Sequence, residues 1–184
     1  MNKTRLQELY ETKIRPDLQQ KLGLKNVMEV PRISKIVINI GLKENIGDTK
    51  VAQRVADTVA RITGQKPVLT LARESIAGFK IREGMQIGVK VTLRRHMMYE
   101  FLDRLINLAL PMVRDFQGVT DTLDRQGNYN LGIRDWNIFP EVEYTVTDQA
   151  QGLNITFHTT TKKDDAAYAL LKAFGMPFKT KNKS

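Results

Sequence analysis

The sequence predicts an α+β fold, in which an antiparallel sheet of about five strands has helices packed on one face and the other face open. Three observations predict it. Short segments alternate apolar and polar residues with a period of two, which is typical of strands with one buried face. Longer segments carry apolar residues every three or four positions, as amphipathic helices do. These segments follow one another in the order α, β, α, β, β, α, β, β, α, which favours an antiparallel sheet over a parallel one.

The first helix and the first strand are predicted near the N-terminus. Thr4, with Gln7 three residues later, is typical of a capping box. The helix that it opens is expected to run to about Leu22 and to end at Gly23. A strand follows, and its apolar side consists of Ile36, Ile38 and Ile40.

One helix and two strands are predicted next. Asp48 or Thr49 can cap the helix, and Gly64 stops it. Its apolar stripe consists of Val51, Val55, Val59 and Ile62. The strands are expected at 66–72 and 87–94. Their apolar sides consist of Leu69 and Leu71 in the first strand, and of Val89, Val91 and Leu93 in the second.

A helix and an irregular segment are predicted in the middle of the second half. The helix is expected at 97–110, before Pro111. Its apolar stripe consists of Phe101, Leu105 and Leu108. Residues 117–137 are rich in Gly, Asp and Asn, so this segment is expected to be irregular.

The C-terminal part predicts a hairpin and a last helix. The two strands of the hairpin are expected at 142–146 and 153–157, on either side of a turn. Thr161 with Asp164 is expected to open the helix, which runs through Ala173. With no linker or repeat in the sequence, we predict a single domain over residues 1–178 and a flexible basic tail at 179–184.

Charge and composition narrow the class of partner. The chain has 29 Lys and Arg against 20 Asp and Glu, a formal net charge of +9, which favours a polyanion. It has no cysteine, which excludes disulfides and thiolate metal sites. No signal-peptide pattern occurs, and no run reaches the roughly 18 apolar residues of a membrane helix. We therefore expect a cytoplasmic protein without a membrane partner.

The open side of the predicted sheet carries basic and neutral polar residues without a carboxylate. In the first three strands these positions are Lys35, Val37, Asn39, Lys66, Val68, Thr70, Lys90, Thr92 and Arg94. Solvated faces usually mix both signs, so this pattern favours an anionic partner. No aromatic residue is expected there to stack on bases. A flat basic face of this kind suits folded RNA, which is recognised through phosphates, 2′-hydroxyls and shape.

Residues 73–86 are expected to form a long loop, in which Gly78 and Gly84 interrupt a run of Arg, Lys and Ser. Phe79 is its one aromatic residue. It is a candidate for packing on a nucleotide or ribose, and the alternative is that it folds back onto the domain.

An enzyme is disfavoured by the motifs that the sequence lacks. No Gly-rich phosphate loop and no dinucleotide fingerprint occur. The two histidines, His96 and His158, lie 62 residues apart, and no nucleophile has a base beside it. We expect no catalysis, no cofactor, no metal and no small-molecule substrate.

Nine motifs, in order along nearly the whole chain, carry a resemblance to a known family. They are Val30–Gly41, Ile62–Pro67, Ser75–Phe79, Gly88–Arg94, Met98–Asp103, Arg114–Gly118, Gly127–Gly132, Ile138–Glu141 and Gly175–Phe178. On these residues the chain resembles the bacterial branch of the large-subunit ribosomal protein L-five family. The resemblance implies a five-stranded sheet and a structural, ribosome-bound protein of the cytoplasm, which binds 5S rRNA in the central protuberance.

The resemblance also implies site residues. Asn39, Gln65 and Thr92 match the polar positions that contact 5S rRNA. With the open-face positions, the expected rRNA-binding set is Lys35, Asn39, Gln65, Lys66, Thr70, Lys90, Thr92 and Arg94. The loop 73–85 matches the one that approaches P-site tRNA, with Arg73, Ser75, Gly78, Phe79, Lys80 and Arg82 as expected contacts.

Further partners implied are large-subunit rRNA and neighbouring ribosomal proteins, including a small-subunit head protein near the acidic segment 119–151. Two alternatives stay open at this point. One is a free-standing RNA-binding or chaperone module, and the other is an RNA-modifying enzyme.

Overall fold

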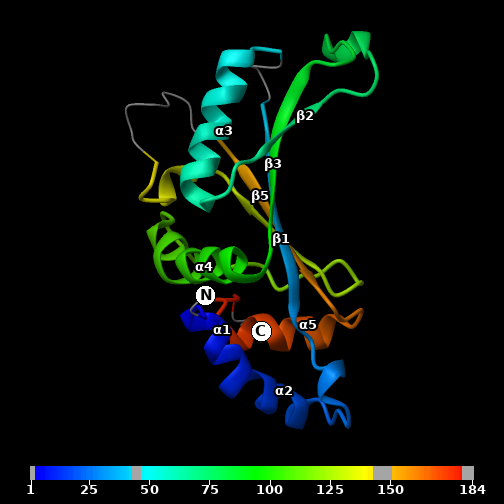
Figure 1. The fold of residues 1–184 in the computed structure, drawn as a ribbon, viewed down its shortest axis with the longest axis vertical. Helices are drawn as coiled ribbons and strands as arrows, with labels where there is room; N and C mark the ends of the chain where they lie inside the picture. The colour runs from blue at the N-terminus through cyan, green and yellow to red at the C-terminus, as the bar shows by residue number, and fades with distance from the viewer. Residues whose placement is uncertain (1–2, 43–46, 143–150, 180–184) are drawn as a thin grey trace. The chain divides into compact units, whose positions relative to one another are not determined.

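The computed structural model describes residues 3–42, 47–142 and 151–179 (Figure 1). Within them, an antiparallel five-stranded sheet has the order β2-β3-β1-β5-β4, which confirms the predicted α+β fold. The strands are β1 (Ile33–Gly41), β2 (Val68–Leu71), β3 (Gln86–Leu93), β4 (Tyr129–Ile133) and β5 (Leu153–Thr159). The α-helices are α1 (Arg5–Leu9), α2 (Arg15–Lys21), α3 (Thr49–Thr63), α4 (Arg95–Arg104) and α5 (Asp164–Ala173). No helix among the described residues is both long and apolar enough to cross a membrane.

The chain divides into two compact units. The hairpin unit comprises residues 37–93 and 132–155, and the terminal unit comprises residues 1–36, 94–131 and 156–184. The predicted single domain over 1–178 stays a prediction. Most of the predicted tail, residues 180–184, lies outside the described residues.

In the hairpin unit, α3 begins and ends where the sequence predicts. The Asp48 side chain accepts hydrogen bonds from the backbone N–H groups of Lys50 (2.9 Å) and Val51 (3.3 Å). Gly64 follows the helix with a φ of 72°, a conformation that favours glycine. The buried face of α3 includes Val55, Val59 and Ile62. In Figure 1, α3 runs beside the β2–β3 hairpin.

The β2–β3 hairpin has an irregular register. It pairs Val68 with Lys90, Leu69 with Val89, Thr70 with Gly88 and Leu71 with Gln86, so the pairing shifts between Thr70 and Leu71. Val89, Val91 and Leu93 are buried, as predicted. The prediction that Leu71 shares a covered side with Leu69 is wrong, since Leu71 is 54% exposed. A register shift breaks the period-two alternation, and a local sequence pattern does not reveal it.

In the terminal unit, the first helix is continuous but not α-helical throughout. Thr4 accepts a hydrogen bond from the Gln7 N–H (3.3 Å), which confirms the predicted N-cap. A π-helical turn, Tyr10–Ile14, joins α1 to α2, and the helix reaches Lys21. The Tyr10 hydroxyl donates to the Pro31 carbonyl (3.0 Å), and its ring stacks on Phe174.

A second π-helical segment, Leu105–Ala109, follows α4 directly. The buried residues of this continuous helix include Phe101, Leu102, Leu105 and Ala109. The prediction that Leu108 lies on the same stripe is wrong, because it is 50% exposed. Hydrogen bonds from i to i+5 turn the chain less per residue than an α-helix does. Leu108 therefore leaves the stripe, and Ala109 takes the buried position.

Strand β4 lies inside the segment 117–137 that the sequence predicts to be irregular, so that prediction is wrong for Tyr129–Ile133. The apolar residues at 129, 131 and 133 do alternate, but Gly132 and the surrounding Gly and Asn residues favour a loop. Of the predicted strand 142–146, Val142 lies in a bend and the rest falls outside the described residues.

The predicted strand at 153–157 is confirmed. Leu153, Ile155 and Phe157 on β5 are all buried, as the alternation indicates.

Helix α5 begins at Asp164, as predicted, but the Asp164 side chain does not cap it. Instead its carboxylate accepts hydrogen bonds from the backbone N–H groups of Arg125 (3.0 Å) and Gly127 (2.9 Å). Thr161 accepts from the Lys163 N–H (3.1 Å). The helix itself, Asp164–Ala173, ends at the predicted residue. Asp164 therefore fastens a distant turn to the helix instead of capping it.

Replacing Asp164 with alanine should lower the free energy of unfolding by about 2 kcal/mol, because two N–H groups lose a charged acceptor. Urea denaturation measures this change. The control is Asp165→Ala, since Asp165 is exposed on the same turn, and we expect a change below about 0.5 kcal/mol. Equal effects of the two substitutions would contradict the assigned role.

Candidate nucleic-acid interface

The hairpin unit contains six of the eight predicted rRNA-binding residues. They are Asn39, Gln65, Lys66, Thr70, Lys90 and Thr92. The other two, Lys35 and Arg94, belong to the terminal unit. Lys35 is half-buried on β1, and Arg94 is exposed immediately before α4. In that unit, burial and then the charge of Lys35 hold the pKa of His158 below its ordinary value.

Five residues of the hairpin unit lie on the side of the sheet that we call the open face. They are Asn39, Val68, Thr70, Lys90 and Thr92. On β1, Asn39 is exposed between the buried Ile38 and Ile40. On β3, Lys90 is exposed and Thr92 half-buried, and they alternate with buried valines. Val68 and Thr70 share the side of Lys90, because they lie opposite Lys90 and Gly88 in the antiparallel register. The face therefore carries one cation, three neutral polar groups and one aliphatic side chain.

Gly88 lies opposite Thr70 in the β2–β3 register, where the strands leave no room for a side chain. A Cβ atom on Gly88 would lie 2.7 Å from the Ile40 carbonyl oxygen and 2.9 Å from Thr70 Oγ1. A residue with a side chain therefore does not fit at the buried Gly88 without a shift of its neighbours.

Gln65 is positioned by the end of α3. The buried Thr63 hydroxyl lies 2.7 Å from the Val59 carbonyl oxygen, to which it donates, and it accepts from the Gln65 N–H (3.3 Å). The Gln65 side-chain Nε2 then donates to the Thr92 carbonyl (3.2 Å). Two residues that lie far apart in sequence are thus joined directly, and Gln65 Oε1 is left as an acceptor.

The lysines of this unit are available to a polyanion. Lys66 and Lys90 are both exposed, and neither pairs with a carboxylate in the described part of the chain. A cation without an internal partner gains most from a phosphate, because binding releases the phosphate's counterions. The amide and hydroxyl groups beside these lysines can hydrogen-bond to ribose hydroxyls or bases.

The loop between β2 and β3 is an ordered continuation of the hairpin (Figure 1). Ile76 and Ile81 exchange two backbone hydrogen bonds (2.9 and 3.1 Å), and a single 3₁₀ turn, Ala77–Phe79, closes the tip. Ser75 Oγ accepts from the Glu83 N–H (2.9 Å). The predicted tRNA contacts Arg73, Ser75, Gly78, Phe79, Lys80 and Arg82 are all exposed on it.

Phe79 is 71% exposed at this tip, so the alternative that it folds back onto the domain is wrong. Large apolar side chains are also exposed along the arms of the hairpin, at Val68, Leu71 and Ile76. Sequence reasoning did not include these three residues in any site. Only for Val68 did the strand alternation indicate an exposed position.

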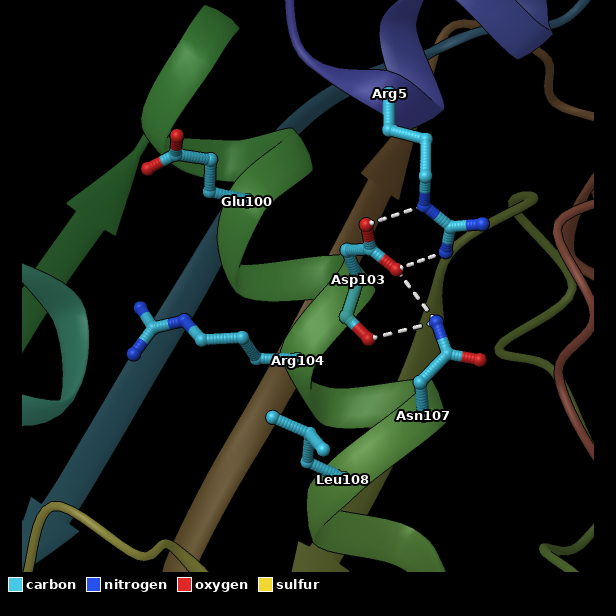
Figure 2. Close-up of a pocket in the computed structure, with 6 residues that line it drawn as sticks. All are labelled: Arg5, Glu100, Asp103, Arg104, Asn107 and Leu108. Atoms are coloured by element: carbon cyan, nitrogen blue, oxygen red, sulfur yellow. Dashed lines mark hydrogen bonds and ion pairs between the residues drawn. The ribbon is translucent and has the colours of Figure 1, made fainter.

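A separate depression of about 680 Å³ lies in the terminal unit, beside α4 (Figure 2). It is lined by Arg5, Glu100, Asp103, Arg104, Asn107 and Leu108. Asp103 accepts hydrogen bonds from the side chains of Arg5 and Asn107, as Figure 2 shows. Glu100 lies 3.4 Å from His96 Nε2. Both carboxylates of the depression, Asp103 and Glu100, thus lie beside neighbouring polar side chains. Among the described residues, no group of three or more His, Asp or Glu side chains could hold a metal ion.

The protein is therefore an α+β protein with a surface suited to bind a polyanion. That surface consists of the open face, the lysines without an acidic partner among the described residues and the exposed basic hairpin. Residues 26–82 match the family model described as ribosomal protein L5, and residues 86–178 match the model of the C-terminus of the same ribosomal family. The chain belongs to the ribosomal protein L5 family, which confirms the resemblance that the motifs predict. This family consists of structural proteins and is not enzymatic, in agreement with the expectation of no catalysis.

Similar proteins cover almost the whole chain. A large ribosomal subunit protein uL5 of Nitrosococcus oceani is 55% identical over 177 residues, which are 96% of this chain and 98% of the relative. A large ribosomal subunit protein uL5 of Syntrophotalea carbinolica is 56% identical over 178 residues, which are 96% and 97% of the two chains.

Proposed function

We propose that this chain is a structural component of the large ribosomal subunit in the cytoplasm and that it binds 5S rRNA through the hairpin unit. The names of its relatives support the coarser part of this proposal. One observation carries the finer part. The hydrogen bond from Gln65 to Thr92 holds two of the polar residues implied by the resemblance beside the unpaired Lys66 and Lys90.

In the proposed interface, charged groups and neutral polar groups contribute differently to RNA binding. Lys66 and Lys90 supply affinity through phosphates, which carry no sequence information. Asn39, Gln65 and Thr92 supply geometry through hydrogen bonds to ribose and base edges. Since no residue of the open face is aromatic, the face recognises the shape of folded RNA and does not stack on splayed bases.

The exposed hairpin tip is proposed to contact P-site tRNA, through the six predicted loop residues. Lys35 and Arg94 of the terminal unit are proposed as further rRNA contacts. Large-subunit rRNA and neighbouring ribosomal proteins, including one of the small-subunit head, complete the proposed partners.

Direct binding tests the central proposal. The purified chain should bind isolated 5S rRNA at least about 10³-fold more tightly than an unrelated RNA of equal length at physiological salt, a ratio typical of specific over non-specific binding. Filter binding measures both affinities. Co-sedimentation with large subunits in high salt then separates a ribosomal component from a free-standing RNA-binding module. Equal affinity for the two RNAs would contradict the proposal.

Replacing Phe79, Lys80 and Arg82 together with alanine should separate the two proposed contacts. Because all three lie on the exposed loop, we expect the 5S rRNA affinity to stay within about threefold, under roughly 0.7 kcal/mol. Ribosomes assembled with this variant should hold P-site tRNA less firmly, most of all at low salt, where screening is weak. A variant that loses 5S rRNA but holds tRNA normally would show that this division is wrong.

A further inference from the structure

Val68 is an aliphatic side chain exposed within a basic surface. It is 68% exposed on β2, which lies at one edge of the described sheet. Isolated exposed apolar residues are common, so exposure alone does not indicate a site. Val68 differs from an isolated apolar residue in its neighbours. Its cross-strand partner is Lys90, and Lys66 lies two residues before it.

The neighbours of Val68 indicate the chemistry of what covers it. Side chains directly opposite each other in an antiparallel pair have Cβ atoms about 5 Å apart, so Val68 stands beside the stem of Lys90. Neither Lys90 nor Lys66 has an acidic partner among the described residues. An apolar protein surface laid on Val68 would leave these charges uncompensated. A polyanion with apolar surface between its charges would satisfy all three side chains.

We propose that Val68 packs against a ribose of the bound RNA, between phosphates that Lys66 and Lys90 contact. The inference rests on the proposed function and adds to it a contact that is not electrostatic. In RNA each ribose lies between two phosphates and offers C–H groups, and the wide, shallow minor groove of an A-form helix exposes these sugars. The β-branched valine has few rotamers, so it loses little conformational entropy on contact.

The experiment separates apolar from electrostatic contacts by their dependence on salt. The affinity of the full chain for isolated 5S rRNA is measured over a series of salt concentrations for the wild type and for Val68→Thr, Val68→Ala and Lys90→Gln. Val68→Thr keeps the side-chain shape and the strand propensity, but it replaces a methyl group with a hydroxyl. The matched control is Val27→Thr, since Val27 is an exposed valine of the terminal unit, outside the open face.

We expect Val68→Thr and Val68→Ala to weaken binding by about three- to tenfold at every salt concentration, with the slope of log affinity against log salt unchanged. Lys90→Gln should reduce that slope by up to about one unit. Val27→Thr should bind within about twofold of the wild type. Urea denaturation of each variant confirms that it is folded, as expected for substitutions at exposed positions.

Three other results would contradict either the proposed function or the proposed contact of Val68. If the wild type itself binds 5S rRNA no more tightly than an unrelated RNA of equal length, measured in parallel, the proposed function is wrong. If the wild type binds and both Val68 variants bind equally well, Val68 does not touch the RNA, and the inference is overturned while the function stands. A change of salt slope in Val68→Thr would also overturn it, because the residue would then act through the neighbouring charges.

Discussion

Replacing Gly127 with alanine is expected to destabilise the protein by about 3–5 kcal/mol, at the upper end of single substitutions. Gly127 has a φ of 75°, which costs a residue with a Cβ atom about 1–2 kcal/mol. The new Cβ would also lie 2.1 Å from the Thr161 carbonyl oxygen. The backbone has little freedom to withdraw, because the Gly127 N–H donates to Asp164 (2.9 Å) and its carbonyl accepts from Thr159 Oγ1 (2.6 Å).

Two other glycines separate the contributions to this effect. Gly23 has a φ of 62° but open space around an added Cβ, so Gly23→Ala should cost only about 1–2 kcal/mol. Gly78 has open space and no positive φ, so Gly78→Ala should change stability by less than about 0.5 kcal/mol. Urea denaturation of the three variants gives the order. If Gly127→Ala were no less stable than Gly23→Ala, the assigned clash with Thr161 would be absent.

Replacing Asn39 with alanine is expected to weaken 5S rRNA binding by about 5- to 150-fold, without unfolding the protein. The loss arises because an RNA group that loses its hydrogen-bond partner in a buried contact costs about 1–3 kcal/mol. The fold tolerates the change, since Asn39 is exposed and its buried neighbours Ile38 and Ile40 are untouched.

The same filter-binding assay measures this variant against a matched control. Gln53→Ala removes another exposed amide, one that lies on α3 and hydrogen-bonds to Asp57 (3.0 Å). We expect the control to bind RNA like the wild type, within about twofold. A folded Asn39→Ala variant with unchanged affinity would show that the open face does not contact 5S rRNA.

The features that the sequence predicts correctly are local ones. The caps at Thr4 and Asp48 each depend on a side chain and an N–H group within three residues. The buried rows of β1, β3 and β5 depend on alternation within one segment. Such signals need no knowledge of what lies across the sheet, so the fold class and most elements can be predicted without a structure.

The predictions that fail involve a change of register within an element. Leu71 is exposed because β2 and β3 shift their pairing beside it, and Leu108 is exposed because a π-helical turn rotates it off the stripe. Neither the register shift nor the π-helical segment is marked by a distinctive residue composition. A period of two or of 3.6 residues, counted along one segment, predicts neither of them.

For the candidate site, the sequence by itself determined the family, the positive charge and the open-face positions Asn39, Lys90 and Thr92. Only the tertiary structure decided which of the predicted site residues contact one another. The bond between Gln65 and the Thr92 carbonyl joins the end of α3 to the end of β3, and no spacing in the sequence predicts it. The tertiary structure also decided that Phe79 stands away from the domain and that Val68 remains uncovered beside Lys90. The physical reason is that exposure depends on what packs against a side chain, whereas a sequence pattern determines only the side to which it points.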